Sequence, residues 1–168
     1  MSDTAELAAR AAAIGVGATL LMDVWALLLR RAGVPSLNLA LLGRWVGHVF
    51  RGRVRHTSIA SAAPIRGERW IGWIAHYAIG ITFSALLLGT FGLEWAESPT
   101  LMPALGTGIA TVVAPLCILQ PGMGAGIASW KTPTPVFNSL KSLITHTVFG
   151  LGMYLAALAA AWAIPVVR

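Results

Sequence analysis

The chain has 168 residues, of which 57% are hydrophobic and only 11% are charged, and its mean hydropathy is +0.74. A soluble domain carries about 25% charged residues, so this composition excludes an ordinary water-soluble globule. Several apolar stretches reach the roughly 20 residues that a helix needs to cross a bilayer, and the alternating strands of a membrane barrel are not seen in the sequence. We therefore expect an all-α, polytopic membrane protein that forms a single domain over residues 1–168.

The formal net charge of +6 is concentrated in one part of the chain. Eight of the twelve Lys and Arg residues lie between Arg30 and Arg69, in a connection between two apolar stretches. In a membrane protein such a bias marks a cytoplasmic loop, so we expect no nucleic-acid partner. The single cysteine, Cys117, lies in an apolar stretch and has no second cysteine with which to form a disulfide.

The first predicted transmembrane helix covers residues 11–29, after a short polar tail at residues 1–8. Gly15, Thr19 and Asp23 recur at every fourth residue, so they share one face of this helix. Small residues on one face allow a neighbouring helix to approach closely. Asp23 should therefore point into the helical bundle.

Residues 30–69 form the basic connection, which we expect on the cytoplasmic side. After Ser36, a largely apolar stretch predicts a short amphipathic helix in the membrane interface. The arginine-rich run that follows predicts contacts with anionic lipid headgroups, although flanking charge of this kind is also general in membrane proteins. No common metal-ligand spacing includes His48 and His56, which we therefore place in the interface. The arginines of the run are Arg51, Arg53 and Arg55.

Three further transmembrane helices are predicted at about residues 70–91, 101–120 and 140–164, which gives a bundle of four. Pro121 lacks a backbone donor and should kink or end the third of these helices. On the fourth helix, small residues at every fourth position form another small-residue face, and two copies of the chain could associate as a homo-oligomer through such faces. These small residues are Gly152, Ala156 and Ala160.

The orientation follows from where the Lys and Arg residues lie. The first and third connections carry ten of them, whereas the two tails and the second connection carry two. Cytoplasmic loops carry the excess of positive charge. We therefore expect a multi-pass protein of a bacterial inner membrane, with both termini outside the cytoplasm.

The second and fourth predicted helices resemble each other. Aligning IAHYAIGITFSALLL with ITHTVFGLGMYLAAL pairs His76 with His146 and Gly80 with Gly150. The first and third helices pair more loosely, and the pairs include Gly15 with Gly106 and Gly33 with Gly124. Both halves would cross the membrane in the same sense, as a parallel duplication. The alternative is chance similarity between helices rich in Gly and Ala.

Asp23, His76 and His146 lie five to seven residues inside the basic ends of three different helices. At about 1.5 Å per residue this places them roughly 8–11 Å inside the cytoplasmic boundary, and Gln120 reaches a similar level. Ionisable groups in hydrocarbon are costly, so they normally face the bundle interior and pair with one another. We therefore predict one intramembrane polar cluster, in which the Asp23 carboxylate accepts a hydrogen bond from an imidazole N–H.

Several interpretations fit this cluster. It could hold the helices together through hydrogen bonds in a purely structural or partner-binding subunit. It could relay protons or ions in a small transporter or channel-like protein. It could also bind a cofactor, with His76 and His146 as axial haem ligands or as part of a divalent-metal site. No nucleophile–base pair, paired carboxylates or dinucleotide fingerprint is present, so we assign no catalytic residue and expect no enzyme.

Four segments of the chain resemble a known family. They are MDVWALLLRRAGVPSLNLALLGRWVGH, APIRGERWIGWIAHYAIGI, QPGMGAGIAS and SLITHTVFGLGMYL, and together they cover most of the chain. The chain resembles a bacterial family of small four-helix inner-membrane proteins that is catalogued only as a domain of unknown function. The resemblance implies a bacterial membrane and about four helices, and it implies no activity, cofactor or partner.

Overall fold

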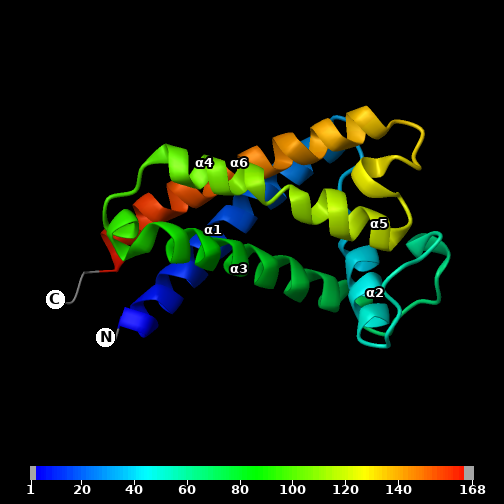
Figure 1. Cartoon of the computed structure of the whole chain (residues 1–168), viewed down its shortest axis with the longest axis horizontal. Helices are drawn as coiled ribbons and strands as arrows, with labels where there is room; N and C mark the ends of the chain where they lie inside the picture. The colour runs from blue at the N-terminus through cyan, green and yellow to red at the C-terminus, as the bar shows by residue number, and fades with distance from the viewer. Residues whose placement is uncertain (1–2, 165–168) are drawn as a thin grey trace.

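The structure, a computed structural model, describes residues 3–164, and these residues form helices and loops with no β-strand (Figure 1). Four helical stretches are long and apolar enough to cross a membrane: Thr4–Arg31, Glu68–Glu97, Leu101–Met123 and Pro135–Ala163. The predicted all-α fold with four membrane-length helices is therefore confirmed. The α-helices are α1 (Asp3–Arg31), α2 (Leu39–Val49), α3 (Glu68–Glu97), α4 (Leu101–Ala110), α5 (Gln120–Met123) and α6 (Pro135–Ala163).

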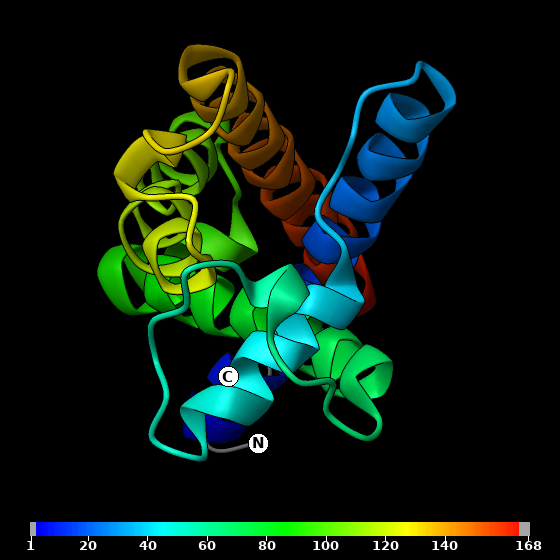
Figure 2. The same cartoon turned by 90° about the vertical axis from the view of Figure 1, so that its right-hand side faces the viewer.

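Helix α1 packs along both α3 and α6, and α4 packs mainly along α6. The first turn of α1 and the last turn of α6 lie at one end of the molecule, and α2 lies at the other end (Figure 1). Figure 2 looks onto this second end, where α2 crosses in front of the long helices and packs on α3. The core between the long helices is apolar, and its most buried members include Ile14, Leu87, Leu88, Phe149 and Met153.

Glycines set the close approach of α1 and α3. A Cβ atom added at Gly15 would lie 2.5 Å from the Ile81 Cα atom and 2.9 Å from the Gly80 carbonyl oxygen. Real Cβ atoms essentially never come so close. The face of α1 on which we predicted close packing is therefore the face that meets α3.

The small-residue face of α6 is used inside the chain. A Cβ at Gly152 would lie 2.9 Å from the Ala18 Cα atom, and a Cβ at Gly17 would lie 2.7 Å from the Ala156 Cβ atom. Both contacts join α6 to α1, because small side chains let two helices pack at short distance. This face of α6 therefore packs against α1 within the chain, and association of two copies stays a prediction.

The third membrane-length helix is interrupted earlier than we predicted. α4 ends at Ala110, and a π-helical segment, η2 (Pro115–Leu119), precedes α5. Pro115 has no N–H to continue the ladder, and the Thr111 carbonyl accepts instead from the Ala114 N–H at 3.0 Å. Pro121 lies in the first turn of α5, where a missing N–H is tolerated. The break therefore precedes Pro115, and the helical stretch ends beyond Pro121 at Gly124.

The two halves of the chain share a helix-ending motif. Gly33 follows α1 with φ +75°, and Gly124 follows α5 with φ +100°. In each case the next residue donates to a carbonyl five residues earlier, Val34 to Leu29 at 2.9 Å and Ala125 to Gln120 at 2.8 Å. Glycine adopts this left-handed conformation without steric cost. The pairing of Gly33 with Gly124 therefore has a structural counterpart.

The basic connection is folded onto the start of α3. The Arg44 guanidinium on α2 donates from Nε and Nη2 to the two carboxylate oxygens of Glu68, at 2.8 Å each. Its Nη1 donates to the carbonyls of Ala60 and Ala62. The hydrogen bond from Glu68 raises the pKa of Arg44 above its usual value, because it favours the charged guanidinium. Arg44 therefore ties α2, the loop around η1 (Ile59–Ser61) and α3 together.

The opposite end of the molecule carries a buried ion pair that we did not predict. Arg10 is fully buried, and its Nε donates to the Glu6 carboxylate at 2.8 Å. Its Nη1 and Nη2 donate to the carbonyls of Ala96 at 3.4 Å and Ile164 at 3.0 Å. The prediction of a polar tail over residues 1–8 was wrong for Asp3 onward, because α1 begins there and Glu6 packs inside. Arg10 thus joins the ends of α1, α3 and α6.

Candidate functional site

The first polar cluster lies between α1 and α3. One Asp23 carboxylate oxygen, Oδ1, accepts from His76 Nε2 at 3.0 Å, and the other, Oδ2, accepts from the Tyr77 hydroxyl at 2.9 Å. The side chains of Asp23 and His76 are 25% and 15% exposed. Both carboxylate oxygens are thus hydrogen-bonded to groups on the neighbouring helix.

The contact between Gly15 and Gly80 explains this arrangement. Gly15 lies two helical turns before Asp23 on the same face of α1, and Gly80 lies one turn after His76 on α3. Close approach of the two backbones therefore brings the carboxylate opposite the imidazole. The Trp73 ring closes the cluster on the side of the basic connection, with its centroid 6.0 Å from Tyr77 and 6.4 Å from His76.

The hydrogen bonds fix where the His76 proton lies. An ionised carboxylate only accepts, so His76 Nε2 must carry a hydrogen. In the neutral ring, Nδ1 is then an acceptor. His76 therefore presents one nitrogen to Asp23 and keeps the other available to bind a proton.

The second histidine, His146, lies between α6 and α4. The Thr111 hydroxyl donates to the Gly108 carbonyl at 2.6 Å, and Thr111 Oγ1 lies 3.0 Å from His146 Nδ1. Because a hydroxyl has one hydrogen, His146 Nδ1 is the donor in the second bond. The backbones approach closely here too, since a Cβ at Gly108 would lie 2.5 Å from the Gly150 Cα atom.

The two histidines thus occupy corresponding places in the two halves. Each lies four residues before a closely packed glycine, Gly80 or Gly150, and each bonds to the preceding membrane-length helix. The glycine facing Gly150 is Gly108, two residues beyond the one paired with Gly15 by sequence.

Gln120 belongs to a third group. Its Nε2 lies 3.3 Å from Ser142 Oγ on α6, and its buried Oε1 has no hydrogen-bond partner among the described residues. No hydrogen bond or ring contact within residues 3–164 joins His76 to His146, or Gln120 to Asp23. The four residues expected in one cluster are therefore distributed over three helix–helix contacts.

This distribution gives no added support to a cofactor held by both histidines. Within the described part of the chain, no group of three or more His, Cys, Asp or Glu side chains could hold a metal ion. Haem or metal ligation by His76 and His146 stays a prediction.

The basic connection differs from our prediction at its histidines. Arg51, Arg53 and Arg55 are exposed, so headgroup contacts stay a prediction. His48 and His56, placed in the interface by sequence, are instead buried, with 7% of each residue exposed. The reason is that the loop after α2 folds back onto α5. There the backbone N–H of His56 donates to the Gly122 carbonyl at 3.0 Å.

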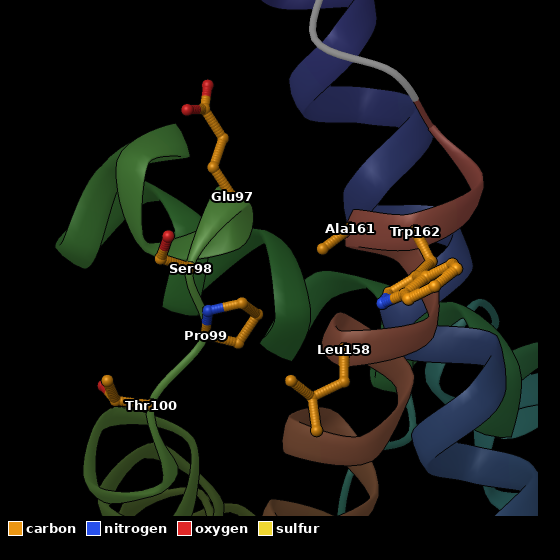
Figure 3. A pocket seen from close by; sticks show the side chains of 7 residues that line it. All are labelled: Glu97, Ser98, Pro99, Thr100, Leu158, Ala161 and Trp162. Atoms are coloured by element: carbon orange, nitrogen blue, oxygen red, sulfur yellow. The ribbon is translucent and has the colours of Figure 1, made fainter.

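A shallow hollow of about 540 Å³ lies at the end of the molecule where α1 begins. In Figure 3 its lining comes from the α3–α4 turn and from α6, where Leu158 and Ala161 face the turn. Its lining includes one carboxylate, Glu97, and no histidine. It lacks the paired titratable groups that distinguish the Asp23 cluster.

Comparison with known proteins identifies one family for this chain. A family model described as "Protein of unknown function (DUF2938)" matches residues 12–160. The chain belongs to the DUF2938 family. The DUF2938 match includes Asp23, His76, Tyr77, Thr111 and His146. No curated protein and no solved structure matches the chain.

Proposed function

We propose that this DUF2938 protein is an integral protein of a bacterial inner membrane, and that it moves protons across it by way of Asp23, His76 and Tyr77. The observation that carries the proposal is a carboxylate inside a membrane-length helix, hydrogen-bonded at both oxygens to groups that can exchange protons. Ionisable side chains at such a depth are costly, and they mark ion or proton pathways by default.

The His76 ring has the two features of a proton shuttle. Nε2 is hydrogen-bonded to Asp23, and Nδ1, which has no hydrogen-bond partner among residues 3–164, can accept a proton. A proton that binds Nδ1 gives an imidazolium whose charge Asp23 stabilises, and loss of the Nε2 proton to the carboxylate completes the transfer. The Asp23 carboxyl then releases its proton to water, and exchange of the ring proton with water returns His76 to the form with a hydrogen on Nε2.

The same proposal assigns an orientation. The end of the molecule that carries α2 holds the basic connection, and cytoplasmic loops are the basic ones. Both termini are then outside the cytoplasm. Arg51, Arg53 and Arg55 lie at the level of anionic lipid headgroups.

A structural role for the cluster makes a different prediction, because hydrogen bonds alone would affect stability and not transport. Purified protein is reconstituted in vesicles that contain a pH-sensitive dye, and proton influx is driven by a potassium diffusion potential. We expect influx above that of protein-free vesicles, and at least a tenfold loss in Asp23→Asn, which cannot accept a proton.

Glu94→Gln is the matched control, since it makes the same acid-to-amide change at an exposed position of α3. We expect it to conduct like the wild type. Equal influx through the wild type and Asp23→Asn, or no influx above protein-free vesicles, would contradict the proposal.

A further inference from the structure

Two buried histidines of the basic connection form a pair that is separate from the Asp23 cluster. His48 lies in the last turn of α2, and His56 lies in the loop that follows. Each residue is only 7% exposed, and the ring centroids are 4.9 Å apart in an edge-to-face arrangement. Most of each ring is thus removed from solvent, so its hydrogen bonds come mainly from the protein or from a ligand.

A backbone carbonyl holds one nitrogen of each ring. His48 Nε2 lies 2.9 Å from the Ala63 carbonyl oxygen, and His56 Nδ1 lies 3.2 Å from the Gly122 carbonyl oxygen. A carbonyl only accepts, so these two ring nitrogens carry the hydrogens. The lone pairs of the neutral rings are then on His48 Nδ1 and His56 Nε2.

The two lone-pair nitrogens have no donor. His56 Nε2 is buried without a hydrogen-bond partner among the described residues, and His48 Nδ1 forms no hydrogen bond to them either. A buried acceptor without a partner is unfavourable. A histidine with one N–H on a backbone carbonyl and the other nitrogen free has the arrangement of metal-ligating histidines.

We propose that His48 Nδ1 and His56 Nε2 bind a divalent transition-metal ion, for which Zn²⁺ is the natural probe. With metal–nitrogen distances of about 2.0–2.1 Å, each ring centroid lies roughly 3 Å from the metal. Centroids 4.9 Å apart then fit two neighbouring positions of a tetrahedron. Opposite positions on a line would need a separation of more than about 6 Å.

The charges near the pair are compatible with a cation. Arg44, one helical turn before His48, is paired with the Glu68 carboxylate, and Arg51, Arg53 and Arg55 are exposed. Because residues 3–164 supply no third His, Cys, Asp or Glu ligand at this pair, water or small anions complete the coordination. The ion fixes the loop of His56 to α2, and the same loop is held to α5 by the hydrogen bond to the Gly122 carbonyl and by the close packing of Gly124 on the Thr57 carbonyl.

The first test uses the unaltered protein, so it does not depend on the folding of a variant. Imidazole ¹⁵N chemical shifts are recorded in detergent during Zn²⁺ titration. We expect saturable changes at two histidines only, at the Nδ1 of one and the Nε2 of the other. Changes at His76 or His146, or no saturable change, would overturn the proposal.

The second test assigns the residues by calorimetry. It uses a Cys117→Ser background, which removes the one thiol of the chain. One equivalent of Zn²⁺ should bind, with an affinity at least tenfold lower in His48→Gln and in His56→Gln. His76→Gln is the matched control and should bind Zn²⁺ like its parent. Unchanged binding in both connection variants, or binding lost in His76→Gln, would contradict the assignment. Proton influx and Zn²⁺ binding depend on different histidines, so either proposal can fail alone.

Discussion

Replacing Arg10 with Met is expected to lower the free energy of unfolding by about 3–5 kcal/mol, the usual loss when one partner of a buried ion pair is removed. Arg10 is fully buried, and it bonds to Glu6 and to carbonyls at the ends of α3 and α6. The variant leaves a buried carboxylate without this partner and two carbonyls without this donor. Unfolding in detergent, followed by circular dichroism, measures the loss.

A double variant separates the charge from the packing. In Glu6→Gln with Arg10→Met the buried negative charge is also gone, so part of the lost stability should return. Arg31→Met is the matched control, since Arg31 is exposed at the end of the same helix, and its effect should stay within about 0.5 kcal/mol. An Arg10→Met protein as stable as the wild type would show that the buried pair does not hold this end together.

The second large effect is expected at Gly15. A Val side chain there collides with the backbone of Gly80 and Ile81 on α3, from which a Cβ atom would be only 2.5–2.9 Å away. Overpacking typically costs about 1–3 kcal/mol. The helices can relieve the collision only by moving apart, so Gly15→Val should also break the bond between Asp23 and His76 and reduce proton influx.

Gly89→Val provides the comparison, because Gly89 lies on α3 and nothing is within 4 Å of an added Cβ. We expect this variant to be at least as stable as the wild type, because valine has a higher helix propensity than glycine, and to conduct like the wild type. Stability is measured as for Arg10, and influx is measured in vesicles. Equal behaviour of the Gly15 and Gly89 variants would contradict the role of the glycine contact.

The sequence predicts the fold well, because membrane-length apolar stretches and small-residue faces are local patterns. It also predicts a contact between Asp23 and an imidazole, and the structure contains one with His76. The signal for Tyr77 was available as well, since it adjoins His76 on an otherwise apolar helix. Its position opposite Asp23 depends on how α3 is rotated, which only the Gly15–Gly80 contact fixes.

Which helices are neighbours could not be predicted. Equal depth suggested that His146 would join Asp23, but its ring faces Thr111, the residue that follows α4. A threonine in an apolar helix gives no sequence signal, because its hydroxyl usually bonds to its own helix. In the sequence, Arg10 directly precedes the first apolar stretch, where a basic residue is common in membrane proteins. The buried pair of His48 and His56 depends on a loop folding back, and a loop has no periodicity to read.

The central claim is that Asp23 and His76 exchange protons during transport. Infrared difference spectra, recorded on reconstituted vesicles after a pH jump, follow the carboxyl and imidazole bands directly. We predict that both bands change together with proton influx in the wild type, and that both changes are lost in Asp23→Asn. Influx that proceeds while the Asp23 and His76 bands stay constant would show that protons take another route.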